Sequence, residues 1–188
     1  FRVHTNLKMT RITVIFIMCI ASAFAKVKTF GPFHVKVFNV TDCGEDGPNI
    51  MHFDVKLQGY NDSSSILDAN VKLPKGFGND VQVSVDVDEW RNNVWVEKVY
   101  TFYFNQMCNG MKEFVKETFT QVTKHLKIED KCPVASGTYT IKEFMLTLIP
   151  NVKEIKYGTY KCKLHAHQGT TPTGCLEATI ETTPKNIK

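Results

Sequence analysis

Apolar and polar residues alternate along most of this chain, which is typical of β-strands with one buried and one exposed face. From Val81 to Val87, for example, every second residue is valine and those between are polar. The expected strands are residues 34–40, 50–58, 67–73, 81–88, 94–105, 138–149, 157–167 and 175–182. Strand 94–105 carries aromatic residues on both faces, which predicts burial on one side and partial cover on the other.

The period changes between residues 107 and 126, where apolar residues follow helical spacing. They are Met107, Met111, Phe114, Val115, Phe119, Val122 and Leu126, and charged residues occupy the opposite face. This pattern predicts one amphipathic helix inserted between strands. Together with about eight antiparallel strands, it predicts an all-β fold of two packed sheets.

Residues 9–25 have the features of a secretory signal peptide: Arg11, a short apolar run, and the small-residue site Ala23-Phe24-Ala25. We expect cleavage after Ala25, no structure in residues 1–8, and one domain from residue 26 to 188. The alternative is a transmembrane anchor, but this apolar run is shorter than the ~20 residues that cross a bilayer.

Removing the leader changes the charge balance. The chain has 23 Lys and Arg against 19 Asp and Glu, and the first 25 residues hold three of the basic residues and no acid. The mature chain therefore has 20 basic against 19 acidic residues. Such a balance predicts neither nucleic acid nor an anionic membrane surface as a partner.

Five cysteines follow the leader: Cys43, Cys108, Cys132, Cys162 and Cys175. An oxidising compartment favours disulfides, but five cysteines cannot all pair within one chain. We expect Cys162 to be the free thiol, because it lies on the apolar face of its strand; a reactive or intermolecular thiol is the alternative. The other four allow three connectivities.

Two N-glycosylation motifs occur in the mature chain, at Asn39 and at Asn61. Asn39 lies near the end of an expected strand, and Asn61 lies in a polar turn. Both positions are expected at the surface.

The sequence offers few candidates for catalysis or metal binding. His165 and His167 could hold a metal, but lysines flank them on the same strand face and no third ligand is close in sequence. Asp86, Asp88 and Glu89 could act as an acid and base pair, but we expect all three on the polar face of a strand. The interpretation favoured for both groups is a solvated strand face, and we expect no enzyme, metal or cofactor.

The abundant large apolar residues have two interpretations. They can fill the core, or they can hold two sheets apart around a dry cavity. A 16-carbon chain buried in such a cavity would gain on the order of 12 kcal/mol before binding costs are subtracted. Alternation alone does not distinguish the two.

Three segments resemble the C-terminal half of the ML-domain lipid-recognition family, and its ganglioside-activator branch in particular. They are CPVASGTYTIKEF from Cys132, YGTYKCKLHA from Tyr157, and GCLEATIE from Gly174. The resemblance extends from Cys108 to the end and is looser from Cys43 to Tyr103. It implies an immunoglobulin-like β-sandwich, or β-cup. The additional cysteines of the ganglioside-activator branch are absent here, and the helix at 109–126 stands in their place.

The resemblance also implies the disulfides Cys43–Cys175 and Cys108–Cys132, and a secreted lipid carrier or presenter without catalysis. Lysosomal location is the alternative. The expected ligand is a fatty acyl, sterol or glycolipid molecule, and a protein receptor or lipid-processing enzyme is a further possible partner. The runner-up function is a lipid-sensing co-receptor or interaction module. Alternation gives these cavity candidates: Phe53, Leu57, Val83, Val85, Tyr100, Phe102, Phe104, Phe114, Phe119, Phe144, Leu146 and Leu164.

Overall fold

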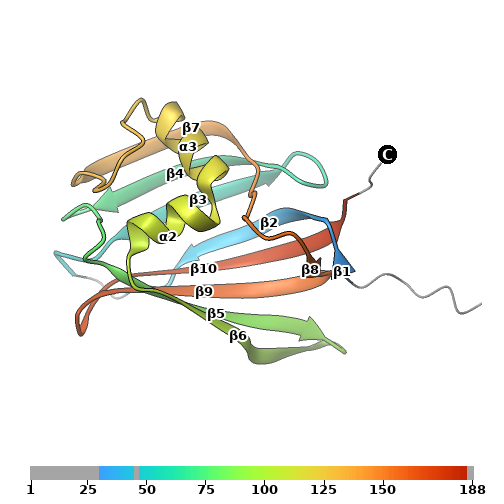
Figure 1. The fold of residues 1–188 in the computed structure, drawn as a ribbon. Helices are drawn as coiled ribbons and strands as arrows, with labels where there is room; N and C mark the ends of the chain where they lie inside the picture. The colour runs from blue at the N-terminus through green and yellow to red at the C-terminus, as the bar shows by residue number, and fades with distance from the viewer. Residues whose placement is uncertain (1–29, 45–46, 186–188) are drawn as a thin grey trace, which may run out of the picture.

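The computed structural model of the chain describes residues 30–44 and 47–185 (Figure 1). The expected leader and the segment before it lie outside these residues. The strands are β1 (Phe30–Gly31), β2 (Phe33–Asp42), β3 (His52–Gly59), β4 (Ser65–Leu73), β5 (Gln82–Arg91), β6 (Val94–Phe104), β7 (Gly137–Leu146), β8 (Ile155–Lys156), β9 (Gly158–Gln168) and β10 (Thr171–Pro184). The helices are α2 (Met107–Phe114) and α3 (Lys116–His125).

The strands form two principal antiparallel sheets, which confirms the predicted β-sandwich class. One sheet has the order β2-β10-β9-β5-β6, and the other has the order β3-β4-β7. The two-residue strands β1 and β8 pair with each other and were not predicted. Figure 1 shows the smaller sheet above, the larger sheet below, and both helices between them at one side.

The prediction of one continuous helix was wrong, because the helix is broken at Val115. The backbone of Val115 leaves helical geometry, with φ −130° and ψ 40°. The carbonyl oxygens of Phe114 and Glu113 accept hydrogen bonds from the backbone N–H and the side chain of Asn151, at 2.6 and 3.2 Å. A residue 36 positions away therefore stabilises the end of α2, and helical periodicity cannot reveal such a contact.

The structure contains both disulfides that the family resemblance implied, Cys43–Cys175 and Cys108–Cys132. The first joins the end of β2 to β10, and the second joins the start of α2 to the segment before β7. Cys162 is the free cysteine among the described residues. Asn39 and Asn61 are both exposed, and their glycosylation remains a prediction.

Neither helix in the described part of the chain combines the length and apolar character of a membrane-spanning segment. The buried apolar residues form two clusters. The larger cluster includes Met51, Leu73, Val83 and Phe119 and joins the two sheets through the helices. The smaller cluster is centred on Leu67 and Phe144 at the small sheet.

Candidate functional site

An apolar cavity of about 200 Å³ lies between the two helices and the small sheet. The helices supply one wall, β3, β4 and β7 supply the opposite wall, and residues of neighbouring connections complete the lining. The lining residues are Met51, Phe53, Val71, Leu73, Phe77, Met107, Met111, Val115, Thr118, Phe119, Val122, Thr123, Leu126, Ile128, Val134, Tyr139 and Ile141. The cavity therefore forms where a helical apolar stripe meets the apolar face of alternating strands.

The few polar groups around the cavity already have partners. Thr118, Thr123 and Tyr139 each donate a hydrogen bond to a backbone carbonyl oxygen, at 3.1, 3.1 and 2.8 Å. The exposed lining of the cavity is consequently apolar throughout. Such a surface favours hydrocarbon and provides no hydrogen bond to a polar ligand group.

The size of the cavity limits what it holds in this conformation. A volume of about 200 Å³ exceeds the roughly 150 Å³ cavity that stays dry and binds benzene. It is smaller than the roughly 300–1,000 Å³ of pockets that enclose drug-sized ligands. The cavity thus accommodates part of a hydrocarbon chain, and a longer chain must extend beyond it.

The structure divides the twelve predicted cavity residues into four groups. Phe53 and Phe119 line the cavity. The larger cluster contains Val83, Val85, Phe104 and Leu164. The smaller cluster contains Leu57, Phe144 and Leu146. The remaining three, Tyr100, Phe102 and Phe114, are 48%, 44% and 37% exposed.

The exposure of β6 corrects the prediction that this strand is buried on one side. Its register places Phe102 opposite Val85 and Tyr100 opposite Val87, so these aromatic residues face inward with the valines. They remain exposed because β6 is the edge strand of the large sheet, on the side away from the small sheet (Figure 1). We call Tyr100, Phe102 and Phe114 the aromatic rim.

Apart from Phe119, the helical half of the cavity lining was not predicted as a site. Sequence periodicity identified Met111, Val115, Val122 and Leu126 as the apolar face of a helix but assigned them to packing. Helical spacing does reveal which residues face inward. It does not reveal whether the facing side chains meet or leave a gap.

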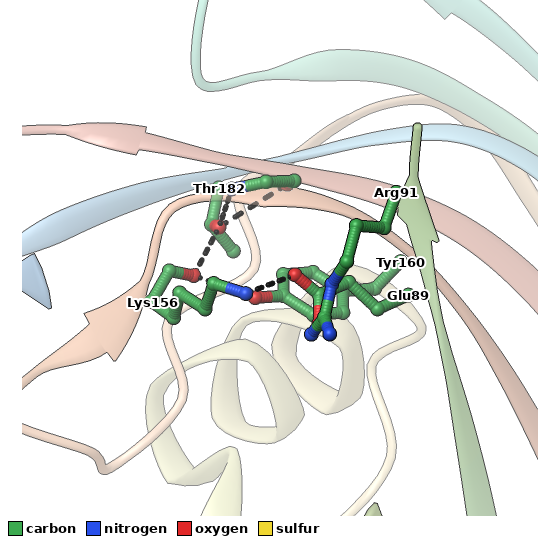
Figure 2. Close-up of polar contacts among 6 residues, drawn as sticks. Glu89, Arg91, Lys156, Tyr160 and Thr182 are labelled. Carbon is green, nitrogen blue, oxygen red and sulfur yellow. Dashed lines mark hydrogen bonds and ion pairs between the residues drawn. The ribbon is translucent and has the colours of Figure 1, made fainter. Parts of the chain in front are cut away.

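A second group of side chains, at the other end of β5, is polar and largely buried (Figure 2). Glu89 is 5% exposed, and its carboxylate forms ion pairs with both Lys156 and Arg91. Beside it, the hydroxyl groups of Tyr160 and Thr182 both donate to the carbonyl oxygen of Lys156, at 2.9 and 3.0 Å. We predicted Glu89 on the solvated strand face with Asp86 and Asp88. That prediction was wrong for Glu89, which is buried. It follows Val87 at a spacing of two and shares its inward face.

These contacts keep Glu89 ionised and Tyr160 protonated near neutral pH. Burial disfavours the charged form of Glu89, but hydrogen bonds from Lys156 and Arg91 outweigh it and hold the Glu89 pKa below its ordinary value. Burial and the charge of Glu89 raise the pKa of Tyr160 to about 12. Neither group is suited to exchange protons near pH 7, and the arrangement fastens β8 to the large sheet.

We expect Glu89 to support stability above about pH 4.3, its ordinary unfolded value, because its folded pKa is lower. That contribution is lost as the pH falls through the folded pKa. Replacing Glu89 with Gln should flatten the acid side of the stability curve, measured by urea unfolding from pH 7 to pH 2.5. The Asp54→Asn variant, at an exposed carboxylate, is the control. An acid limb of equal slope in wild type and Glu89→Gln would contradict this assignment.

The other candidate reactive groups are also placed by the structure. Burial raises the pKa of the Cys162 thiol to about 11, so the thiolate is scarce at neutral pH. Burial and the neighbouring Lys163 lower the pKa of His165. Across residues 30–44 and 47–185, no group of three His, Cys, Asp or Glu side chains could hold a metal ion.

Comparison with known proteins finds similarity among solved structures. No family model matches the chain, and no curated protein matches it. Among solved structures it is similar to chicken MD-1, which was crystallised in complex with lipid IVa. The similarity covers 82% of this chain and 99% of that chain, at 14% sequence identity and a TM-score of 0.37. Because this similarity is weak, we infer function from the residues of this chain.

Proposed function

We propose that this protein binds a lipid by enclosing part of its hydrocarbon between α2–α3 and the small sheet, without catalysing a reaction. The observation that carries the proposal is the cavity of about 200 Å³ with an exclusively apolar exposed lining. Burying about eight methylenes there would gain roughly 6 kcal/mol before the costs of binding are subtracted. Little of this gain remains after those costs are subtracted, so the part of the lipid outside the cavity must also contribute to binding.

The rest of a longer hydrocarbon chain would leave the cavity along an apolar surface. Phe104 packs against the same cluster as the cavity walls, and its ring lies 5.9 Å from that of Phe114 in the aromatic rim. The inward faces of Phe102 and Tyr100 continue this surface along β6. The proposed ligand is therefore an acyl or sterol lipid that is only partly enclosed, as a carrier or presenter requires.

The domain proposed for this role extends from residue 26 to 188 and is secreted or lysosomal. Its two disulfides fit an oxidising compartment. The aromatic rim also supports a second candidate, a lipid-sensing interaction module in which a protein partner covers the rim. Lipid uptake that increases affinity for a receptor would distinguish that module from a simple carrier.

We expect the protein purified from a eukaryotic secretory host to retain a lipid that native mass spectrometry detects and organic extraction identifies. Replacing Val122, which lines the cavity, with Phe should weaken lipid uptake at least tenfold, because the larger side chain occupies the space for hydrocarbon. The Val94→Phe variant is the control, because Val94 is 58% exposed on β6. An apo mass with no uptake of fatty acids, sterols or glycolipids would contradict the function.

A further inference from the structure

The large sheet has a long free edge along β6. This strand lies at the end of the sheet, and among the described residues no other strand pairs with its outer side (Figure 1). At 11 residues it is longer than most strands. An edge strand presents backbone N–H and C=O groups without partners, so it is a template for a further strand unless its residues prevent pairing.

The first part of β6 is protected against such pairing. Lys98 adopts φ +51°, and the register with β5 shifts opposite it. Its backbone N–H donates to the carboxylate of Asp88 at 2.9 Å, and its ammonium nitrogen lies 3.1 Å from the carboxylate of Asp86. An irregular register and charged side chains are two ways in which proteins protect a sheet edge. The protection ends at Lys98.

The second part of β6, residues 99–104, has no such protection. Its sequence, VYTFYF, contains no charged residue, proline or glycine, and every side chain is aromatic or β-branched. Tyr103 is 76% exposed, and Tyr100 and Phe102 belong to the exposed aromatic rim. A segment of this composition on an open edge favours pairing with another strand.

The other edges of the two sheets differ from this segment, because each of them carries charged residues. Lys36 lies in β2, Asp54 and Lys56 lie in β3, and Lys142 and Glu143 lie in β7. Charged residues on an edge disfavour pairing. Residues 99–104 are therefore the exception among the sheet edges of the described chain.

Residues 99–104 are complementary to a second copy of themselves. In antiparallel pairing about a two-fold axis, residues opposite one another must lie on the same face of the sheet. An axis at Thr101 places Val99 opposite the partner's Tyr103, and Tyr100 opposite the partner's Phe102. Pairs of aromatic residues, and of aromatic with β-branched residues, stabilise neighbouring strands.

The charge of the chain also permits this partner. The mature chain expected from the sequence has 20 basic against 19 acidic residues, so two copies meet without net repulsion. We propose that two copies of this protein pair through residues 99–104 of β6 and join their five-stranded sheets into one. Pairing at the edge leaves the inward face of β6 uncovered, so the proposal does not rest on the lipid-binding function.

The area of the exposed aromatic residues predicts a reversible dimer. Tyr100, Phe102 and Tyr103 together expose roughly 340 Å² per copy, if a fully exposed aromatic side chain offers about 200 Å². Two copies thus offer roughly 700 Å², which is below the roughly 1,000 Å² typical of stable interfaces. We expect a dissociation constant on the order of 10 μM.

The test measures the mass of the protein by sedimentation velocity from about 1 to 200 μM, where wild type should change from monomer to dimer. Thr101→Lys should raise the dissociation constant at least tenfold, because two ammonium groups then lie directly opposite one another at the axis. In the monomer the new ammonium group lies beside Asp86, which already accepts a hydrogen bond from Thr101, so the fold should persist. An equimolar mixture of Thr101→Lys and Thr101→Glu should recover the dimer.

The matched control is Thr140→Lys on β7, the edge strand of the small sheet. Thr140 is also exposed and donates to Asn70 at 2.9 Å, as Thr101 donates to Asp86 at 2.9 Å. This variant should dimerise like wild type. A wild type that stays monomeric, a mass that grows beyond two copies, or unchanged dimerisation of Thr101→Lys would overturn the proposal. None of these outcomes would alter the lipid uptake proposed above.

Discussion

Replacing Cys43 or Cys175 with alanine is expected to lower the free energy of unfolding by about 2–5 kcal/mol. The bridge closes a segment of 132 residues, so it removes much of the conformational entropy of the unfolded chain. It also holds the end of β2 to β10. For a chain of this size the melting temperature should fall by roughly 4–20 °C, which differential scanning calorimetry under non-reducing conditions would measure.

Two further variants make this result specific to the bridge. Opening Cys108–Cys132, which spans 24 residues, should cost less, about 3.4 against about 5 kcal/mol in the chain-entropy model. Replacing the free Cys162 with alanine should cost no more than about 1.5 kcal/mol, because only a small apolar group is lost. A Cys43 variant that unfolds at the wild-type temperature would show that the bridge does not constrain the unfolded chain.

The strands of this fold were predictable because one face of each is apolar and the other is polar. The alternation at 81–88 predicted β5, and Val83 and Val87 are buried as expected. This period is a local property, so it identifies strands without knowledge of their neighbours. It does not identify the edge of a sheet, and for that reason Tyr100 and Phe102, which face inward as predicted, are nevertheless 48% and 44% exposed.

The features that sequence missed depend on contacts between distant residues. The break at Val115 is stabilised by Asn151, and the burial of Glu89 depends on Lys156, 67 residues later. A charged residue in an alternating segment is ordinarily assigned to the solvated face, since isolated buried carboxylates are unfavourable. Two cations make this burial tolerable: Arg91, on the same strand, and Lys156, on β8.

The candidate site was predictable only in small part, for the same reason. Phe53 and Phe119 were identified from periodicity, whereas the cavity itself is a gap between two apolar faces. Its volume depends on how far α2 and α3 lie from the small sheet, and that separation is set by the disulfide at Cys108 and by hydrogen bonds such as that from Thr118 to Thr147. None of these distances is encoded in a local pattern.

Replacing Phe119 with alanine is expected to destabilise the ligand-free protein by about 3–5 kcal/mol. Phe119 is 5% exposed, belongs to the larger apolar cluster, and forms part of the cavity wall. Loss of its ring removes buried apolar contacts and enlarges a cavity that is already present. Chemical denaturation of the ligand-free variant, compared with wild type, would measure the loss.

Phe38 provides a matched control for Phe119. Each ring lies under a lysine ammonium group, at 5.6 Å for Lys112 over Phe119 and 5.5 Å for Lys36 over Phe38, but Phe38 is 48% exposed. Phe38→Ala should therefore cost less than about 1 kcal/mol. This pair separates the effect of burial from that of the cation–π contact, since both variants lose the latter.

Ligand binding should then distinguish a lipid cavity from an ordinary packing defect. A ligand present at 100 times its dissociation constant stabilises the folded state by about 2.7 kcal/mol. An apolar ligand such as dodecane should restore much of the stability of Phe119→Ala, because its hydrocarbon fills the enlarged space. If Phe119→Ala is destabilised as expected but gains nothing from any apolar ligand, the space beside α3 is a gap in the core and not a binding site.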